Sequence, residues 1–285
     1  MAWRRTGSGS GRRVRRSARL VVAVVAGLTV GIVPVAVPAS AVAPSPAATS
    51  GAAPGAAAGP ALQGATVGSS TDRAYVRQSY SDLLDRVADL GGVDYWSGLL
   101  TGGGISRYGF VSGLANSSEW VAHIVTGFYT DTLGRAPDAA GLAYWVGQLT
   151  SGSQSMAQVA ASFYSSAEYF AGFGASNLDT WVEDLYAKIL HRAADTGGRD
   201  YWAGVAAARG RTAVAYAFYQ SNESCRDRVD DLYLVLLGRS PDPAGQAYWA
   251  GRIVASGDIT LAAQLASSEE YYQRAQALTS RVSTS

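Results

Sequence analysis

The chain has 285 residues, of which 48% are hydrophobic and 16% are charged, and its formal net charge is +1. A single cysteine, Cys225, excludes a disulfide within the chain, so the stability has to come from a packed core. Beyond the N-terminus the basic residues are spread out. This excludes the basic patch needed to bind nucleic acid or an anionic membrane surface.

The N-terminal segment predicts a secretory signal peptide over residues 1–41. Its first nineteen residues hold seven arginines and no acidic residue, an apolar stretch runs from Leu20 to Val37, and small residues end it at Ala39-Ser40-Ala41. An uncleaved membrane anchor is the alternative, because eighteen residues just span a bilayer. Pro34 and the small residues favour cleavage, by either the general or the twin-arginine route. We therefore expect a secreted, extracellular or cell-envelope-associated protein with no membrane span after cleavage.

Cleavage changes the charge of the protein. Seven arginines leave and none of the 22 acidic residues does, so the formal charge falls from +1 to −6. Residues 42–71 are nearly all Ala, Pro, Gly, Ser and Thr, which cannot bury enough apolar surface to offset the entropy of ordering. We predict a disordered linker over 42–71 and a flexible tail over 277–285.

A motif of Arg, Asp, Gly and Tyr-Trp recurs four times between Tyr75 and Ala275, and each Trp lies ten residues after its Arg. A glutamate in a Ser-x-Glu element follows 21 to 23 residues after each Trp. The four sets are Arg86, Asp89, Gly92, Tyr95, Trp96, Glu119; Arg135, Asp138, Gly141, Tyr144, Trp145, Glu168; Arg192, Asp195, Gly198, Tyr201, Trp202, Glu223; and Arg239, Asp242, Gly245, Tyr248, Trp249, Glu270. A repeat of about fifty residues predicts one supersecondary unit per copy.

Each copy predicts about three helices and no strand, so the fold class is all-α with four tandem repeats. Apolar residues ahead of each Arg recur at helical spacing, which gives the buried face of a first helix. The Asp is placed to cap a second helix, on which Trp145 faces the core. Ser155 and Gln158 form a capping box that opens a third helix. We expect all four repeat tryptophans to be buried.

The copies alternate in detail. Copies one and three share GGxDYW (91–96 and 197–202), whereas copies two and four share LGRxPD and GxAYW. The order is A-B-A-B, which predicts two pairs over residues 72–174 and 175–276, joined near Gly174. A fragment from about Thr180 to Ala275 would then fold alone.

The segment LGRAPDxxGLAYW at 133–145, followed by SxEY at 166–169, resembles the bacterial domain-of-unknown-function family four-two-one-four (DUF4214), grouped with phycobilisome-linker-like helical repeats. The resemblance covers essentially the whole repeat region. It implies all-helical repeats on secreted or surface-associated proteins, and it supplies no activity and no catalytic residue.

The sequence offers no catalytic or metal site. It lacks the nucleophile-elbow, phosphate-loop, dinucleotide-binding and zinc-protease motifs, and its two histidines, His123 and His191, fall in different copies. Cys225 lies beside arginines that lower a thiol pKa, but a semi-buried structural thiol is the simpler interpretation. Each Asp stands beside an Arg, which is a poor calcium cage. We expect no enzyme activity, no cofactor and no metal.

Adjacent helix positions point about 100° apart, so a buried Trp leaves the preceding Tyr nearer the surface. The candidate contact residues are therefore Tyr95, Tyr144, Tyr201 and Tyr248, with boundary packing as the default role. We expect a non-enzymatic interaction or structural module whose partner is an extracellular or cell-envelope protein or glycan. The alternatives are a cell-wall glycan binder that uses these tyrosines and an enzyme of unrecognised type.

Overall fold

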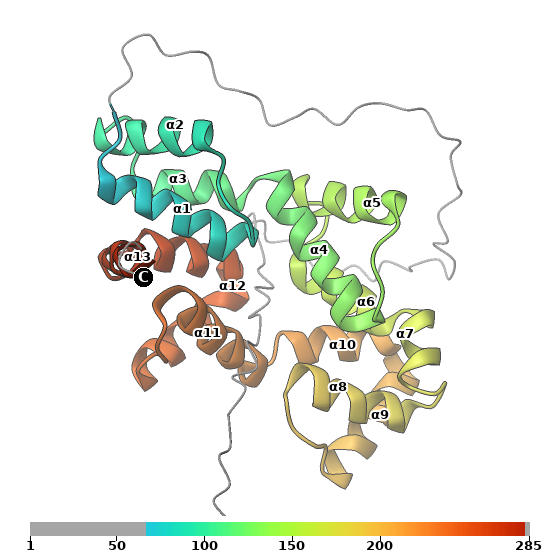
Figure 1. The fold of residues 1–285 in the computed structure, drawn as a ribbon. Coiled ribbons are helices and arrows are strands. Elements are labelled where there is room, and N and C mark those ends of the chain that lie inside the picture. Colours follow the sequence, from blue (N-terminus) through green and yellow to red (C-terminus); the bar gives the residue numbers. More distant parts are fainter. Residues whose placement is uncertain (1–66, 283–285) are drawn as a thin grey trace, which may run out of the picture.

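The computed structural model describes residues 67–282, so the predicted signal peptide and most of the predicted linker lie outside the described residues. The described part is all-helical, without a strand (Figure 1). Its helices are α1 (Ser70–Leu84), α2 (Leu90–Thr101), α3 (Arg107–Ala115), α4 (Ser118–Leu133), α5 (Ala139–Thr150), α6 (Met156–Ser165), α7 (Ala167–Gly172), α8 (Leu178–Ile189), α9 (Thr196–Arg209), α10 (Arg211–Tyr219), α11 (Asn222–Leu237), α12 (Pro243–Ser267) and α13 (Glu269–Val282). Between residues 67 and 282, no helix has the length and apolar character to cross a bilayer.

The four sequence motifs fall on successive helices, and we call the helices around each motif one copy. Copy one is α1–α3, copy two is α4–α6, and copy four is α11 with α12. The two halves of α12 meet at Gly257, which has a positive φ of 75°. Copy three begins with α7 and α8, because its first helix is interrupted after Gly172, and continues with α9 and α10. The last helix, α13, begins like another first helix, since Ser268 caps it as Ser117 caps α4.

Local residue chemistry explains where the helices start and stop. Ser117, Ser166 and Ser221 accept a hydrogen bond from a backbone N–H three residues on, which satisfies a free donor at the helix start. Gly134 and Gly238 end α4 and α11 at φ 67° and 71°, as expected of left-handed C-caps.

The third helices pack in an order that the sequence does not predict. α3 packs on α12, so copy one contacts copy four, and α6 packs on α10, so copy two contacts copy three. The last helix α13 lies beside α1, which closes the chain on itself (Figure 1). The A-B pairs expected from the sequence are therefore not the pairs that pack through their third helices.

The contact of α1 with α12 and α13 is made by buried tyrosines. The Tyr75 hydroxyl donates to the Ala266 carbonyl oxygen at 2.8 Å, and the Tyr271 hydroxyl donates to Asp82 at 2.9 Å. Copies one, two and four share one core, while a second core joins α8–α10 to residues of α6 and α7. The boundary placed at 174/175 falls inside that second core, because Tyr169 and Trp181 lie on either side of it and are both fully buried.

Both predicted ends of the repeat region were misplaced. Ser69 caps α1 and the helix begins at Ser70, so Ser70 and Thr71 are helical rather than linker. The helix α13 continues to Val282, so residues 277–282 are helical where a flexible tail was expected. The C-terminal residues stay helical because α13 packs on the rest of the protein through buried Tyr271 and Ala275.

Candidate functional site

An Arg–Glu ion pair joins each copy to the helix that follows it. Arg135 Nε and Nη2 donate to the two carboxylate oxygens of Glu168 at 2.6 and 2.8 Å. The same two-pronged pair forms at Arg86–Glu119, Arg192–Glu223 and Arg239–Glu270. The bonded guanidinium holds the pKa of Glu168 below its ordinary value. Because both side chains are nearly half exposed, each pair contributes little stability and mainly fixes the geometry of the junction.

The arginine also covers an aromatic ring. The Arg135 guanidinium lies 5.0 Å from the ring centre of Tyr129, within the range of a cation–π contact. The equivalent rings belong to Tyr80, Tyr186 and Tyr233. These four tyrosines are further members of the motif that were not predicted from the sequence. Each lies six residues before its Arg, and this fixed offset is the signal that identifies them.

The repeated Asp is committed to a helix cap. Asp138 Oδ1 accepts from the Gly141 N–H at 2.8 Å, and this hydrogen bond lowers the pKa of Asp138. A Cβ on Gly141 would come closer than 3.0 Å to the Tyr129 hydroxyl, which explains the glycine. Asp89, Asp195 and Asp242 cap their helices in the same way. Within residues 67–282, no group of His, Cys, Asp or Glu has an arrangement that could hold a metal ion.

The repeat tryptophans are half-buried, so the expectation that they are buried was wrong. Trp145 packs against Phe163 of α6 with ring centres 5.3 Å apart, while its other side stays accessible. The residues in the same position are Trp96, Trp202 and Trp249, which are also half-buried. The reason is that the second helix lies on the outside of its repeat and contacts the core along one side only (Figure 1). The fully buried tryptophans are Trp120 and Trp181, on first helices.

The tyrosine before each repeat Trp is exposed. Tyr95, Tyr144, Tyr201 and Tyr248 expose 37%, 49%, 63% and 56% of their surface. Each ring stands edge-on to its Trp, with ring centres 5.0 to 5.1 Å apart and planes at 74° to 77°. We call these four Tyr-Trp pairs the aromatic ledges. They lie on four separate helices, α2, α5, α9 and α12, in one repeated geometry.

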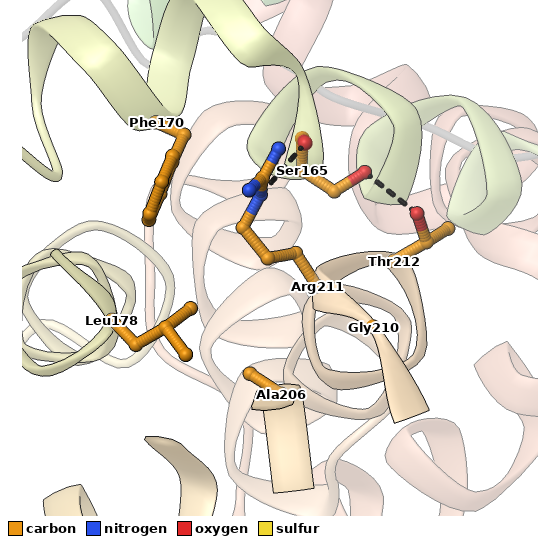
Figure 2. Close-up of a pocket in the computed structure, with 7 residues that line it drawn as sticks. All are labelled: Ser165, Phe170, Leu178, Ala206, Gly210, Arg211 and Thr212. Carbon is orange, nitrogen blue, oxygen red and sulfur yellow. Dashed lines mark hydrogen bonds between the residues drawn. The ribbon is translucent and has the colours of Figure 1, made fainter. Parts of the chain in front are cut away.

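Copy three carries a second feature, a hollow of about 450 Å³ where α6 to α10 meet. We call it the α6–α10 hollow, and its lining is Ser165, Phe170, Leu178, Ala206, Gly210, Arg211 and Thr212 (Figure 2). It lies beside the interruption between α7 and α8, where Ala175 and Ser176 both adopt positive φ (48° and 56°). Non-glycine residues seldom adopt this conformation.

Arg211 is the charged residue of the hollow. Its guanidinium lies 4.0 Å from the ring centre of Phe170, and its Nε donates to the Ser165 carbonyl oxygen at 3.2 Å. Burial lowers the pKa of Arg211. The Ser165 and Thr212 hydroxyls bond each other at 2.9 Å across the rim (Figure 2).

The remaining reactive side chains do not come together. His123 and His191 lie in different copies, and His191 occupies the left-handed position after α8 (φ 52°). Cys225 is fully buried rather than semi-buried, and this burial raises the pKa of its thiol. Arg228 bridges Cys225 to buried Asp258, with an Nη2 to Sγ distance of 3.4 Å. A buried thiol of raised pKa is a poor nucleophile.

Comparison with known proteins identifies the family. The profile of the domain of unknown function DUF4214 matches residues 63–124, 122–173 and 160–228. The chain belongs to this family. The motif around Arg239 lies beyond the matched residues, yet its Arg–Glu, Asp–Gly and Tyr–Trp contacts are those of the other three sets. No curated protein and no solved structure matches the chain.

Proposed function

We propose that the protein is a secreted or cell-envelope-associated, non-enzymatic interaction module that binds its partner through the aromatic ledges. The observation that carries the proposal is the repeated exposure of one tyrosine per copy at one geometry. Tyrosine combines a large rigid apolar surface with a polar hydroxyl, which is why it is enriched at protein interfaces.

Several features support a binding role over catalysis. The repeated Asp residues cap helices and the repeated Glu residues pair with arginine, so the four-fold repeated polar groups are committed to structure. A closed set of helical repeats presents the ledges on separate helices, which suits a partner of extended or repetitive shape. The basic N-terminal segment followed by small residues supports export. We further infer four copies derived from a duplicated A-B pair, which the contacts around Arg239 support.

The decisive experiment compares two sets of tyrosine variants. In the test variant, all four ledge tyrosines are replaced by alanine. In the control, Tyr108→Ala is combined with Tyr216→Ala, which removes tyrosines that are 44% and 42% exposed but lie outside the motif. Binding to a partner isolated from the cell envelope should fall at least tenfold with the test variant and less than twofold with the control. Equal binding by both variants would show that the ledges are not the contact surface.

The alternative function, a cell-wall glycan binder, is favoured by the same exposed rings, because aromatic side chains stack on sugar faces. Sedimentation with purified insoluble cell wall separates the two functions. A glycan binder would sediment with protein-free wall and lose this property with the four-fold tyrosine variant. A protein-binding module would stay in the supernatant.

A further inference from the structure

Helices α3 and α10 occupy equivalent places in the two packed pairs. Each is a third helix that packs on the third helix of another copy, α12 for α3 and α6 for α10. The helix that follows the partner is α13 in the first pair and α7 in the second. The first residue of α3 is Arg107 and the first residue of α10 is Arg211, and both reach the start of that following helix.

The two arginines make the same ring contact. Arg107 lies over Tyr272 at 4.6 Å and Arg211 over Phe170 at 4.0 Å. Each ring comes four residues after the serine that caps its helix, Ser268 and Ser166. The two environments are therefore related by the repeat, and they are directly comparable.

The two environments differ in whether a carboxylate pairs with the arginine. Arg107 Nη2 donates to Glu269 at 2.8 Å, and Glu269 directly follows the capping serine of α13. The residue that directly follows the capping serine of α7 is Ala167. Within residues 67–282, Arg211 forms no ion pair with an acidic side chain. In the same residues its only hydrogen bond is the one from Nε to the Ser165 carbonyl oxygen, so the two terminal amino groups make none there. In copy three, the α6–α10 hollow lies beside this guanidinium (Figure 2).

We propose that the α6–α10 hollow binds a ligand that carries a carboxylate next to a small apolar group. The carboxylate pairs with the terminal amino groups of Arg211, as Glu269 pairs with Arg107. The apolar group lies against Leu178 and Ala206, with the Thr212 hydroxyl at the rim. A volume of about 450 Å³ is in the range of small-molecule sites. The site does not involve the aromatic ledges.

The direct test is a titration of the isotope-labelled full-length chain followed by NMR. The probes are N-acetyl-leucine and N-acetyl-leucinamide, which differ only in the carboxylate. We expect saturable shifts at the Arg211 side-chain N–H and at Gly210 and Thr212, with a Kd of roughly 1 mM or tighter. The amide should bind at least tenfold more weakly. Equal affinity for the two probes, or no saturable binding of either, would overturn the proposal.

The second test is a substitution that gives Arg211 a carboxylate from the protein itself. Ala167 is exposed, so Ala167→Glu is compatible with folding and places a carboxylate where α13 has Glu269. It should weaken binding of N-acetyl-leucine at least tenfold with an unchanged or raised Tm. The matched control Ala167→Gln should bind within twofold of wild type. Arg211→Gln should lose binding as well, and wild-type affinity in Ala167→Glu would refute the site.

A third probe tests whether the carboxylate belongs to a peptide C-terminus or to a small carboxylic acid. It is the dipeptide N-acetyl-alanyl-leucine with a free or amidated C-terminus. Tighter binding of the free dipeptide than of N-acetyl-leucine identifies a peptide C-terminus as the source. Tighter binding of N-acetyl-leucine identifies a small carboxylic acid. In both cases the free acid has to bind better than its amide, and failure of that difference contradicts the proposal.

Discussion

Gly141 and Gly147 lie on the same helix, α5, and the structure predicts opposite effects of alanine at the two positions. A Cβ on Gly147 meets nothing within 4 Å, whereas a Cβ on Gly141 comes closer than 3.0 Å to the Tyr129 hydroxyl. Alanine in an open helical position stabilises by about 0.5–1 kcal/mol, because it lowers the backbone entropy of the unfolded chain. Forcing extra volume into a packed site costs about 1–3 kcal/mol.

Both substitutions gain the same entropy term, so the free energies of unfolding of Gly147→Ala and Gly141→Ala should differ by the cost of the clash, about 1–3 kcal/mol. The assay is urea unfolding followed by circular dichroism, with wild type between the two variants. Tyr129→Phe removes only the hydroxyl that the added Cβ would meet, so on its own it should change the free energy of unfolding by about 1 kcal/mol or less. In the Gly141→Ala background it should cost less or stabilise, because it removes the clash. Equal stability of the two alanine variants would refute the reasoning.

Four further predictions follow from burial, ion pairing and packing. Because Trp145 is half-buried, Trp145→Ala should cost about 2–3 kcal/mol, below the cost for a fully buried Trp, and an unchanged Tm would contradict its packing on Phe163. The pKa of Glu168 in the folded protein lies below its ordinary value of 4.5. The ion pair with Arg135 therefore stabilises the folded protein at a pH above 4.5, and this stabilisation is lost as the pH falls through the pKa of the folded state. At pH 7 Glu168→Gln should lower the free energy of unfolding by at most about 1 kcal/mol, because the pair is exposed. The difference in Tm between wild type and this variant should shrink as the pH falls below 4.5, and a constant difference would argue against the pair. A fragment of residues 175–276 lacks α3 and α6, the partners of its third helices, so its circular-dichroism melt should show no cooperative transition, contrary to the expectation from the A-B pairs. Micromolar calcium should leave the Tm of the full chain unchanged, since the repeated Asp residues are engaged as helix caps, and a rise of many degrees would overturn this assignment.

Local features of the fold could be predicted from the sequence because they depend on residues close together along the chain. The helical periodicity, the Asp138 cap three residues before its Gly, and the left-handed Gly134 all involve interactions within one or two turns. The exposure of Tyr144 follows from the same geometry, because the half-buried Trp145 directs its neighbour outward. Residue identity at these offsets is sufficient to specify such features.

The tertiary structure alone decided which copies pack together and where a site could form. The third helices of all copies carry similar apolar residues, so their sequences do not specify that α3 packs on α12 or α6 on α10. That choice depends on the complementary shapes of surfaces far apart in the chain, such as Tyr75 and Ala266. Arg211 is an unremarkable helix-start arginine in the sequence. Only the approach of α10 to the start of α7 shows that Ala167 stands where an equivalent arginine finds a glutamate.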